Sequence, residues 1–400
     1  MSKHVPGIII STLLFFTACT KTIIKNEESV SPTVNSQKLP VSCEVREDVA
    51  KTAAAYKAKA AKPVPQTPVV LLLDFNGQQV TNSAWSSPGT ISCPAAPASL
   101  LTNSMKDYIL QSVAEDYSGF FVTVTKNEQD YQAASPSRRM RCVITYNMMN
   151  QFGNVGGISF VSSMLWGDNT PCFVFCDVLQ FNQKYIAGAV SHELGHTFGL
   201  QHQARYGEDC GQIEEYHTGF GWDALGWAPI MGISYYQNLV TWHKGQTSLG
   251  CDQPQNDMNV IRTVAGAKTD DYGGTLNNNT VQIPSSGTKK GILENADDKD
   301  AFLKNETNAR RIKLVSSGNS DLALEVYNTN GQLATVYDDV NGTDVNVVIS
   351  GKKYLKVRIS SNQPFVPAGD GFGGYYHHDK QSIVYYFLIS YRETSQLSIS

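Results

Sequence analysis

The chain has 400 residues, with 32 basic and 36 acidic side chains and a formal net charge of −4. This length allows two domains of ordinary size, and an apolar fraction of 41% is enough to form hydrophobic cores. The slightly acidic balance and the lack of any basic run argue against a nucleic-acid partner.

The N-terminus has the pattern of an export signal. An apolar run from Val5 to Ala18 is too short to span a bilayer as a helix and fits a signal-peptide core. Small residues directly before Cys19 resemble a bacterial lipoprotein cleavage site. The resemblance implies a signal peptide over residues 1–18, lipidation of Cys19 and a membrane anchor in the bacterial cell envelope, at the outer membrane or cell surface. The alternative is an ordinary secreted protein cleaved nearby. Nothing later in the sequence is long and apolar enough to span a membrane.

A polar segment, residues 19–67, follows and ends in KPVPQTP. One interpretation is a solvated spacer that holds a folded domain away from a membrane. The other is a propeptide-like segment, in which Cys43 would supply a thiolate that blocks a metal site.

Removing Cys19 from the eight cysteines leaves seven. An exported protein can hold disulfides, and an odd number leaves at least one thiol free or paired elsewhere. Cys210 and Cys251 bracket one segment and could pair, but the connectivity cannot be deduced from the sequence.

A folded domain is predicted over residues 68–264. It begins with VVLLLDFNG, residues 69–77, a continuous apolar run that indicates a buried strand. Residues 100–120 have helical spacing. The segments FVTVT, RCVITYN, GGISFVSSML and PCFVFCDVL read as strands and precede a histidine-rich helix. This order of strand, helix, strands and helix indicates an α/β layered structure.

The composition then changes twice. Residues 265–288 are rich in Gly, Asn, Ser and Thr and read as a linker. From residue 289 to 400 the pattern consists of strands alone, with tight-turn signals at Asn330-Gly331 and Asn341-Gly342. Several short alternating strands separated by turns predict a β-sandwich.

The segment SHELGHTFGLQHQ, Ser191 to Gln203, carries the chemistry. In a helix at about 100° per residue, an apolar stripe lies on one side and His192 and His196 point to nearly the opposite side. Histidines at i and i+4 are close enough to share one metal ion. The stripe consists of Ala187, Val190, Leu194 and Phe198.

Gly199 should end this helix, so that the chain reverses and His202 approaches the same point. Three neutral imidazoles suit zinc and leave a fourth position for water. Glu193, rotated off that axis, would accept the proton of the water and return it to a leaving amine. The predicted reaction is peptide-bond hydrolysis without a covalent intermediate.

At every fixed position, HELGHTFGLQH resembles the metzincin zinc-peptidase signature. The resemblance implies that His192, His196 and His202 bind one zinc ion and that Glu193 is the general base. Metzincins also have a methionine turn beneath the metal, and APIMGISYY resembles it, with Met231 as an apolar floor.

Some metzincins place a tyrosine two residues after that methionine, where it stabilises the oxyanion. Ile233 occupies this position here, and Tyr235 and Tyr236 come later. A contact of either tyrosine with the oxyanion or the substrate therefore stays open beside a purely structural role.

Further segments, including VAEDYSGFFVTVT and WAPIMGISYYQNLVTWHKGQ, resemble bacterial reprolysin-like metzincins. GILENADDKDAF and the strands after it resemble a prepeptidase C-terminal-type β-sandwich. Together the resemblances imply an α+β catalytic domain, with a mixed twisted sheet and long helices, followed by an all-β sandwich. In metzincins the substrate lies extended along a sheet edge; GGISFVSSM is either that edge or an ordinary interior strand.

The sequence thus predicts a zinc-dependent endopeptidase acting on extracellular or envelope proteins, with protein or peptide substrates as its partners. Two alternatives stay open: an adhesin or binding module with a vestigial zinc site, and a hydrolase of peptidoglycan-type amides. His217 and His243 read as surface or structural residues. Asp297, Asp298 and Asp300 either bind calcium through their oxygen atoms or simply belong to solvated turns. The oligomeric state is not predicted.

Overall fold

The computed structural model describes residues 42–48, 51–52, 67–86, 88–221, 226–293, 298–316, 322–338, 345–359 and 384–392. All of these belong to one unit, Pro40–Ser400. Cys19, Asp297 and the Asn341-Gly342 turn lie outside the described residues, so the predictions made for them are not addressed. Within the described part, no helix has the length and apolar character needed to cross a membrane.

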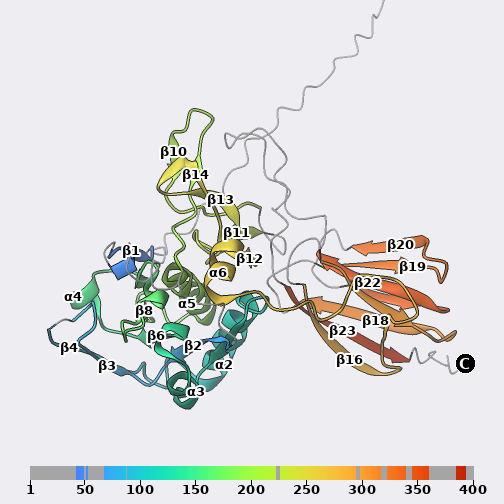
Figure 1. Ribbon diagram of the computed structural model, residues 1–400, viewed down its shortest axis with the longest axis horizontal. Helices are drawn as coiled ribbons and strands as arrows, with labels where there is room; N and C mark the ends of the chain where they lie inside the picture. The colour runs from blue at the N-terminus through green and yellow to red at the C-terminus, as the bar shows by residue number, and fades with distance from the viewer. Residues whose placement is uncertain are drawn as a thin grey trace, which may run out of the picture. The chain divides into compact units, whose positions relative to one another are not determined.

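The α/β part of the chain is built on a six-stranded sheet in the order β1-β7-β8-β6-β2-β5. Four of its strands, β1, β8, β6 and β2, are labelled in Figure 1. β2, β5, β6 and β8 are parallel to their neighbours in this group, whereas β7 runs antiparallel to β8, so the sheet is mixed, as predicted. The strands are β1 Glu44–Arg46, β2 Val69–Asp74, β5 Val122–Thr125, β6 Arg139–Thr145, β7 Gly157–Phe160 and β8 Cys172–Phe175.

Parallel strands covered on both faces read as continuous apolar runs rather than as alternating patterns. β2 is the clearest case, since all six of its residues are buried. This burial explains why VVLLLD could be identified as a strand from the sequence alone.

Two long helices, α2 Asn103–Asp116 and α5 Gln183–Phe198, belong to this part, together with the shorter α3 Glu128–Ala133, α4 Met149–Phe152 and α6 Asp257–Ala265. The helix α5 begins at Gln183, because the Asn182 side chain accepts hydrogen bonds from the backbone N–H groups of Lys184 and Tyr185. The Tyr117 hydroxyl, just after α2, donates to the Ser191 carbonyl at 3.0 Å and so ties α2 to α5.

Four two-stranded sheets complete this part: β3 Gln78–Thr81 with β4 Thr90–Cys93, β9 Arg205–Tyr206 with β10 Gln212–Glu214, β11 Trp227–Pro229 with β12 Leu239–Thr241, and β13 Lys244–Thr247 with β14 Gly250–Asn256. A disulfide between Cys210 and Cys251, with Cα atoms 5.6 Å apart, joins the turn before β10 to the start of β14. The pairing raised from the sequence is therefore present.

The C-terminal strands form a five-stranded sheet, β15-β17-β22-β19-β20, and a four-stranded sheet, β16-β23-β18-β21. Phe302, Leu324 and Leu355 from the first sheet share one buried cluster with Ile312 and Leu388 from the second, which is the arrangement of a β-sandwich. The strands are β15 Val281–Gln282, β16 Gly287–Leu293, β17 Asp300–Lys304, β18 Arg310–Ser316, β19 Leu322–Tyr327, β20 Leu333–Asp338, β21 Val345–Ile349, β22 Lys353–Ile359 and β23 Val384–Arg392.

The sandwich core includes part of the segment predicted as a linker. β15 pairs with β17, and Tyr272 and Ile283 pack against the sandwich core. A strand of two residues between polar turns has no periodicity, so the sequence pattern could not reveal it.

Candidate metal centre

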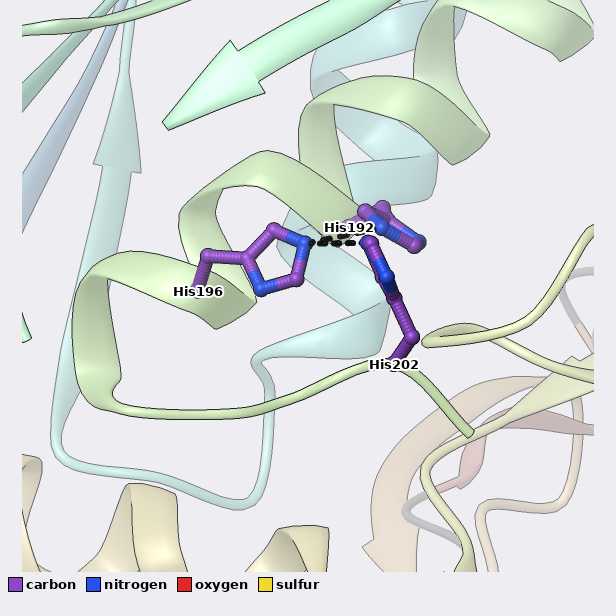
Figure 2. A group of neighbouring side chains, drawn as sticks. All are labelled: His192, His196 and His202. Atoms are coloured by element: carbon purple, nitrogen blue, oxygen red, sulfur yellow. Dashed lines mark hydrogen bonds between the residues drawn. The ribbon is translucent and has the colours of Figure 1, made fainter. Parts of the chain in front are cut away.

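The three predicted ligand histidines come together at the end of α5 (Figure 2). His192 and His196 lie one turn apart on the helix. Gly199 then adopts the left-handed conformation, with φ of 115°, and its N–H donates to the His196 carbonyl at 2.9 Å. This conformation favours glycine and ends the helix, so that the following residues bring His202 back to the same point.

The Nε2 atom of His196 lies 3.0 Å from Nε2 of His192 and 3.0 Å from Nε2 of His202. All three rings are buried, with at most 3% of any of these residues exposed. Zinc–nitrogen bonds of about 2.0–2.1 Å in a tetrahedral site would separate the ligand atoms by about 3.3 Å. The trio therefore has close to the spacing that one zinc ion needs.

The hydrogen bonds made by the Nδ1 atoms of His192 and His196 indicate which ring nitrogens carry protons. His192 Nδ1 lies 2.8 Å from the Ile230 carbonyl oxygen, and His196 Nδ1 lies 2.7 Å from the Leu200 carbonyl oxygen. A carbonyl only accepts, so each Nδ1 donates, and each neutral ring points an Nε2 lone pair at the common centre. A cation can accept both lone pairs at once, so the three residues could hold a metal ion.

The rings are also in the protonation state that ligation requires. Burial lowers the pKa of His192 to about 4, and burial together with the neighbouring His192 ring lowers that of His202 to about 2. The pKa of His196 is lowered well below its ordinary value by burial and by both neighbouring rings. Charged imidazolium is thus disfavoured at neutral pH.

The predicted methionine packs directly under α5. Met231 is fully buried, and a Cβ added to Gly195, between the two helical ligands, would lie 2.7 Å from its Sδ atom. A larger residue at this position would therefore have to displace the sulfur. Ile230, the residue before Met231, provides the carbonyl that orients the His192 ring.

Glu193 lies beside His192, with its side chain wholly buried. The Ser159 hydroxyl donates to Oε2, and Ser159 Oγ also lies 2.9 Å from the Glu193 carbonyl oxygen. Among the described residues, Oε1 has no hydrogen-bond partner. Burial raises the pKa of Glu193 to about 8, and contacts with Cys43 and Ser159 oppose this rise only in part. Ser159 thus holds one carboxyl oxygen, whereas the other is buried without a hydrogen-bond partner among the described residues.

Cys43 occupies the same site. Its Sγ, a ring nitrogen of His192 and a carboxylate oxygen of Glu193 all lie within 4.8 Å of one another. Sγ is also 3.6 Å from the Tyr235 hydroxyl, and the Tyr216 hydroxyl donates to the Cys43 carbonyl at 2.6 Å. Burial, followed by the neighbouring Glu193, raises the pKa of this thiol well above its ordinary value.

The residues after Cys43 cover the edge of the main sheet. β1 pairs in parallel with β7, with Glu44 opposite Ile158 and Arg46 opposite Phe160. Backbone hydrogen bonds from Gly156 N to the Ser42 carbonyl and from Val161 N to the Arg46 carbonyl continue the pairing at both ends. In this conformation β7 is an interior strand, because the chain's own N-terminal segment fills the place next to it.

The two predicted tyrosines are in different environments. Tyr235 is 6% exposed and its hydroxyl reaches Cys43, whereas Tyr236 is 48% exposed and packs against the Tyr185 ring. Only Tyr235 is therefore placed near the metal ligands. The Tyr216 ring, with its centroid 4.3 Å from that of His202, is a further neighbour that the sequence analysis did not identify.

Ser159 and Tyr216 were missed because a lone serine in an apolar strand and a lone tyrosine in a loop carry no periodic signal. His217 and His243 are both buried and pack against Trp227, so of the two predicted roles they have the structural one. Asp298 and Asp300 converge with Asp270, and all three lie within the sandwich and the segment that precedes it.

The chain matches no protein-family model and no curated protein. Among solved structures, 31% of this chain is similar to 97% of the pre-peptidase C-terminal domain of a collagenase from Bacillus anthracis, at 16% identity and a TM-score of 0.20. Another match covers 28% of this chain and 92% of PliG from Aeromonas hydrophila, a periplasmic inhibitor of g-type lysozyme, at 13% identity and a TM-score of 0.19. PliG from Salmonella Typhimurium matches 28% of this chain over 96% of its own length, at 15% identity and a TM-score of 0.18. At this level of similarity, the function has to be argued from the site itself.

Proposed function

We propose that the protein is a zinc-dependent endopeptidase of the metzincin type, in which His192, His196 and His202 hold one zinc ion and Glu193 is the general base. The observation that carries the proposal is the pair of Nε2 lone pairs directed at one buried point beside the Glu193 carboxyl group, whose Oε1 has no hydrogen-bond partner among the described residues. Zinc, when bound, would polarise the substrate carbonyl and lower the pKa of water.

In this proposal the chain's own residues position the groups and move the proton. Glu193 takes a proton through Oε1 and later delivers it to the leaving amine. Ser159, which donates to Oε2, keeps the carboxylate turned toward the ligands. The Ile230 and Leu200 carbonyls keep the Nδ1 atoms of His192 and His196 protonated, so that their other nitrogens stay free for the metal.

A peptide substrate is favoured over the alternatives by the way β1 pairs with β7. An extended chain binds at this edge through backbone hydrogen bonds, which recognise a peptide with little demand on its side chains. A peptidoglycan-type amide hydrolase has no use for such an edge. The complete set of ligands and the intact Glu193 speak against a vestigial site in an adhesin.

The described conformation is a closed form of the proposed enzyme. Cys43 lies where a substrate would approach the ligands, and β1 occupies the edge where a peptide would pair. Of the spacer and propeptide interpretations, the second therefore explains the position of residues 42–48 better, since a spacer would not enter the site. Substrate can bind only after this segment has left.

An exported location is part of the same proposal. The Cys210–Cys251 disulfide is of a kind that persists in oxidising compartments. Anchoring through Cys19, and a role for the sandwich as a prepeptidase C-terminal-type module, are proposed from the sequence resemblance alone.

The deciding experiment is a peptide-library digest with the full chain. Cys43→Ala protein should cleave peptides after zinc loading, and both chelation and Glu193→Ala should abolish the cleavage. Cleavage that persists in both controls would refute the mechanism. Binding of peptides by zinc-loaded Cys43→Ala protein without any cleavage would favour the binding-module alternative.

A further inference from the structure

The docked N-terminal segment runs along a row of three aromatic rings beside β7. The ring centroids of Trp85 and Phe160 are 4.2 Å apart, and those of Phe160 and Trp166 are 5.3 Å apart. We call Trp85, Phe160 and Trp166 the aromatic row. All three side chains stay partly exposed even with the segment in place.

Two basic side chains of the segment lie on the outer rings of this row. The Arg46 guanidinium carbon is 5.4 Å from the centroid of the Trp85 ring, and Lys51 Nζ is 4.8 Å from that of Trp166. At these separations the ring faces attract a cation. Arg46 is also 3.8 Å from Glu44 of its own segment.

A carboxylate adds charge selectivity at one end of the row. Asp168 Oδ2 pairs with Lys51 Nζ at 2.8 Å, and Asp168 Oδ1 accepts a hydrogen bond from the Thr170 backbone N–H at 2.9 Å. The second contact, made within the same loop, orients the carboxylate through an oxygen other than the one that meets Lys51. Aromatic faces alone would take any apolar side chain, whereas rings combined with a carboxylate favour a cation.

Strand pairing sets which residue of a bound peptide meets the row. Residues directly opposite each other on paired strands project their side chains to the same face of the sheet. Arg46 is paired with Phe160, whose ring contacts Trp85. Any peptide residue paired with Phe160, whichever way the peptide runs, therefore presents its side chain beside Trp85.

We propose that the aromatic row and Asp168 form a recognition surface for basic side chains, and that the substrates are peptides with Arg or Lys about three residues from the bond at the metal. The spacing follows from the segment itself, where Cys43 lies at the ligands and Arg46 lies at Trp85. The inference rests on the proposed function, because it assigns the substrate class of that site. In the closed form, Arg46 and Lys51 hold the segment on the same surface.

The test measures binding separately from catalysis. The protein is the full chain carrying Glu193→Ala to prevent cleavage, and Cys43→Ala, Arg46→Ala and Lys51→Ala to free the surface. The probe is a fluorescent peptide with the sequence of residues 40–52 and serine in place of Cys43. A second probe replaces its arginine by citrulline and acetylates its lysine, which removes both charges at nearly the same shape.

The charged peptide should bind about ten-fold more tightly than the neutral one, as expected for two cation–ring contacts and one ion pair. This ratio, measured by fluorescence anisotropy, should fall to about two-fold or less when Trp85→Leu or Asp168→Asn is added. Tyr108→Leu, which removes an exposed aromatic ring from α2, should leave the ratio unchanged.

Equal affinity for the two probes would overturn the inference. An affinity ratio that stays at about ten-fold in both Trp85→Leu and Asp168→Asn proteins would also overturn it. The same probes, offered to zinc-loaded protein with Glu193 intact, test the proposed function separately. A charge preference in binding, together with no cleavage of any peptide in the library digest, would contradict the peptidase and leave the recognition surface standing. If both probes bind with equal affinity and are cleaved at equal rates, the recognition surface is contradicted and the peptidase stands.

Discussion

Cys43 and Glu193, from distant parts of the sequence, meet beside His192, with Sγ and a carboxylate oxygen within 4.8 Å of each other. One residue belongs to the N-terminal segment and the other to α5. Their contact places a potential fourth ligand beside the proposed general base. Both groups would have to separate before a substrate carbonyl could lie between them.

Replacing Cys43 by alanine should therefore raise peptidase activity by about ten-fold or more, because the fraction of molecules with an open site increases. In wild-type protein loaded with Co²⁺, the thiolate should give a charge-transfer absorption band that Cys43→Ala lacks. Cys93→Ala, which removes another buried thiol, serves as the control and should change neither readout. Identical activities and spectra for all three proteins would contradict a blocking role.

Metal content should follow the three predicted ligands and no other histidine. His196→Ala is expected to lose zinc most completely, because His196 is the ring in contact with both others. His243→Ala should retain one zinc per chain, since His243 packs against Trp227 and lies outside the ligand group. Elemental analysis after dialysis against a weak chelator provides the measurement. Equal losses in the two variants would mean that unfolding, and not ligation, controls the zinc content.

The Glu193→Gln protein should still bind the metal but should lose catalytic activity. The amide has nearly the shape of the carboxyl group but cannot accept the proton, so kcat should fall by about 10²–10⁴-fold in the Cys43→Ala background. Ser159→Ala should give a smaller loss, because it frees the carboxylate to rotate without removing the base. Steady-state kinetics and zinc analysis on the same samples separate the two effects. A Glu193→Gln protein that retains full activity would exclude the residue as the base.

The stability of the fold should depend on pH through Asp116. This carboxyl group is buried, with a pKa raised by burial to about 7, and it accepts a hydrogen bond from Ser191 Oγ at 2.5 Å. Between about pH 4 and pH 7 the folded chain keeps a proton that the unfolded chain has already lost. The folded state is therefore stabilised below this range and loses that contribution as the pH rises to about 7.

Asp116→Asn does not titrate and should not share this loss. Its free energy of unfolding should improve relative to wild type as the pH is raised from 5 to 8, by an amount on the order of a few kcal/mol. Urea titrations at several pH values, monitored by tryptophan fluorescence, measure the difference. Parallel stability curves for the two proteins would show that Asp116 ionises normally in the folded state.

The chemistry of α5 is determined locally, which is why it could be predicted. Histidines four residues apart face the same way on any helix, and Gly199 supplies the left-handed turn that brings His202 back. The strand β2 could also be predicted, because a parallel strand buried on both faces has an unbroken apolar run in its sequence.

Tertiary structure alone decided what surrounds these histidines. β1 has only three residues, too few to show a period, and its pairing with β7 is a contact between distant segments. Ser159, Tyr216 and Tyr235 likewise reach the site from separate strands and loops. A sequence records the periodicity of each helix or strand, but which strand lies beside which depends on how the whole chain packs. The grouping of the three histidines was therefore readable from the sequence, whereas the approach of Cys43 to them was left open until the fold was known.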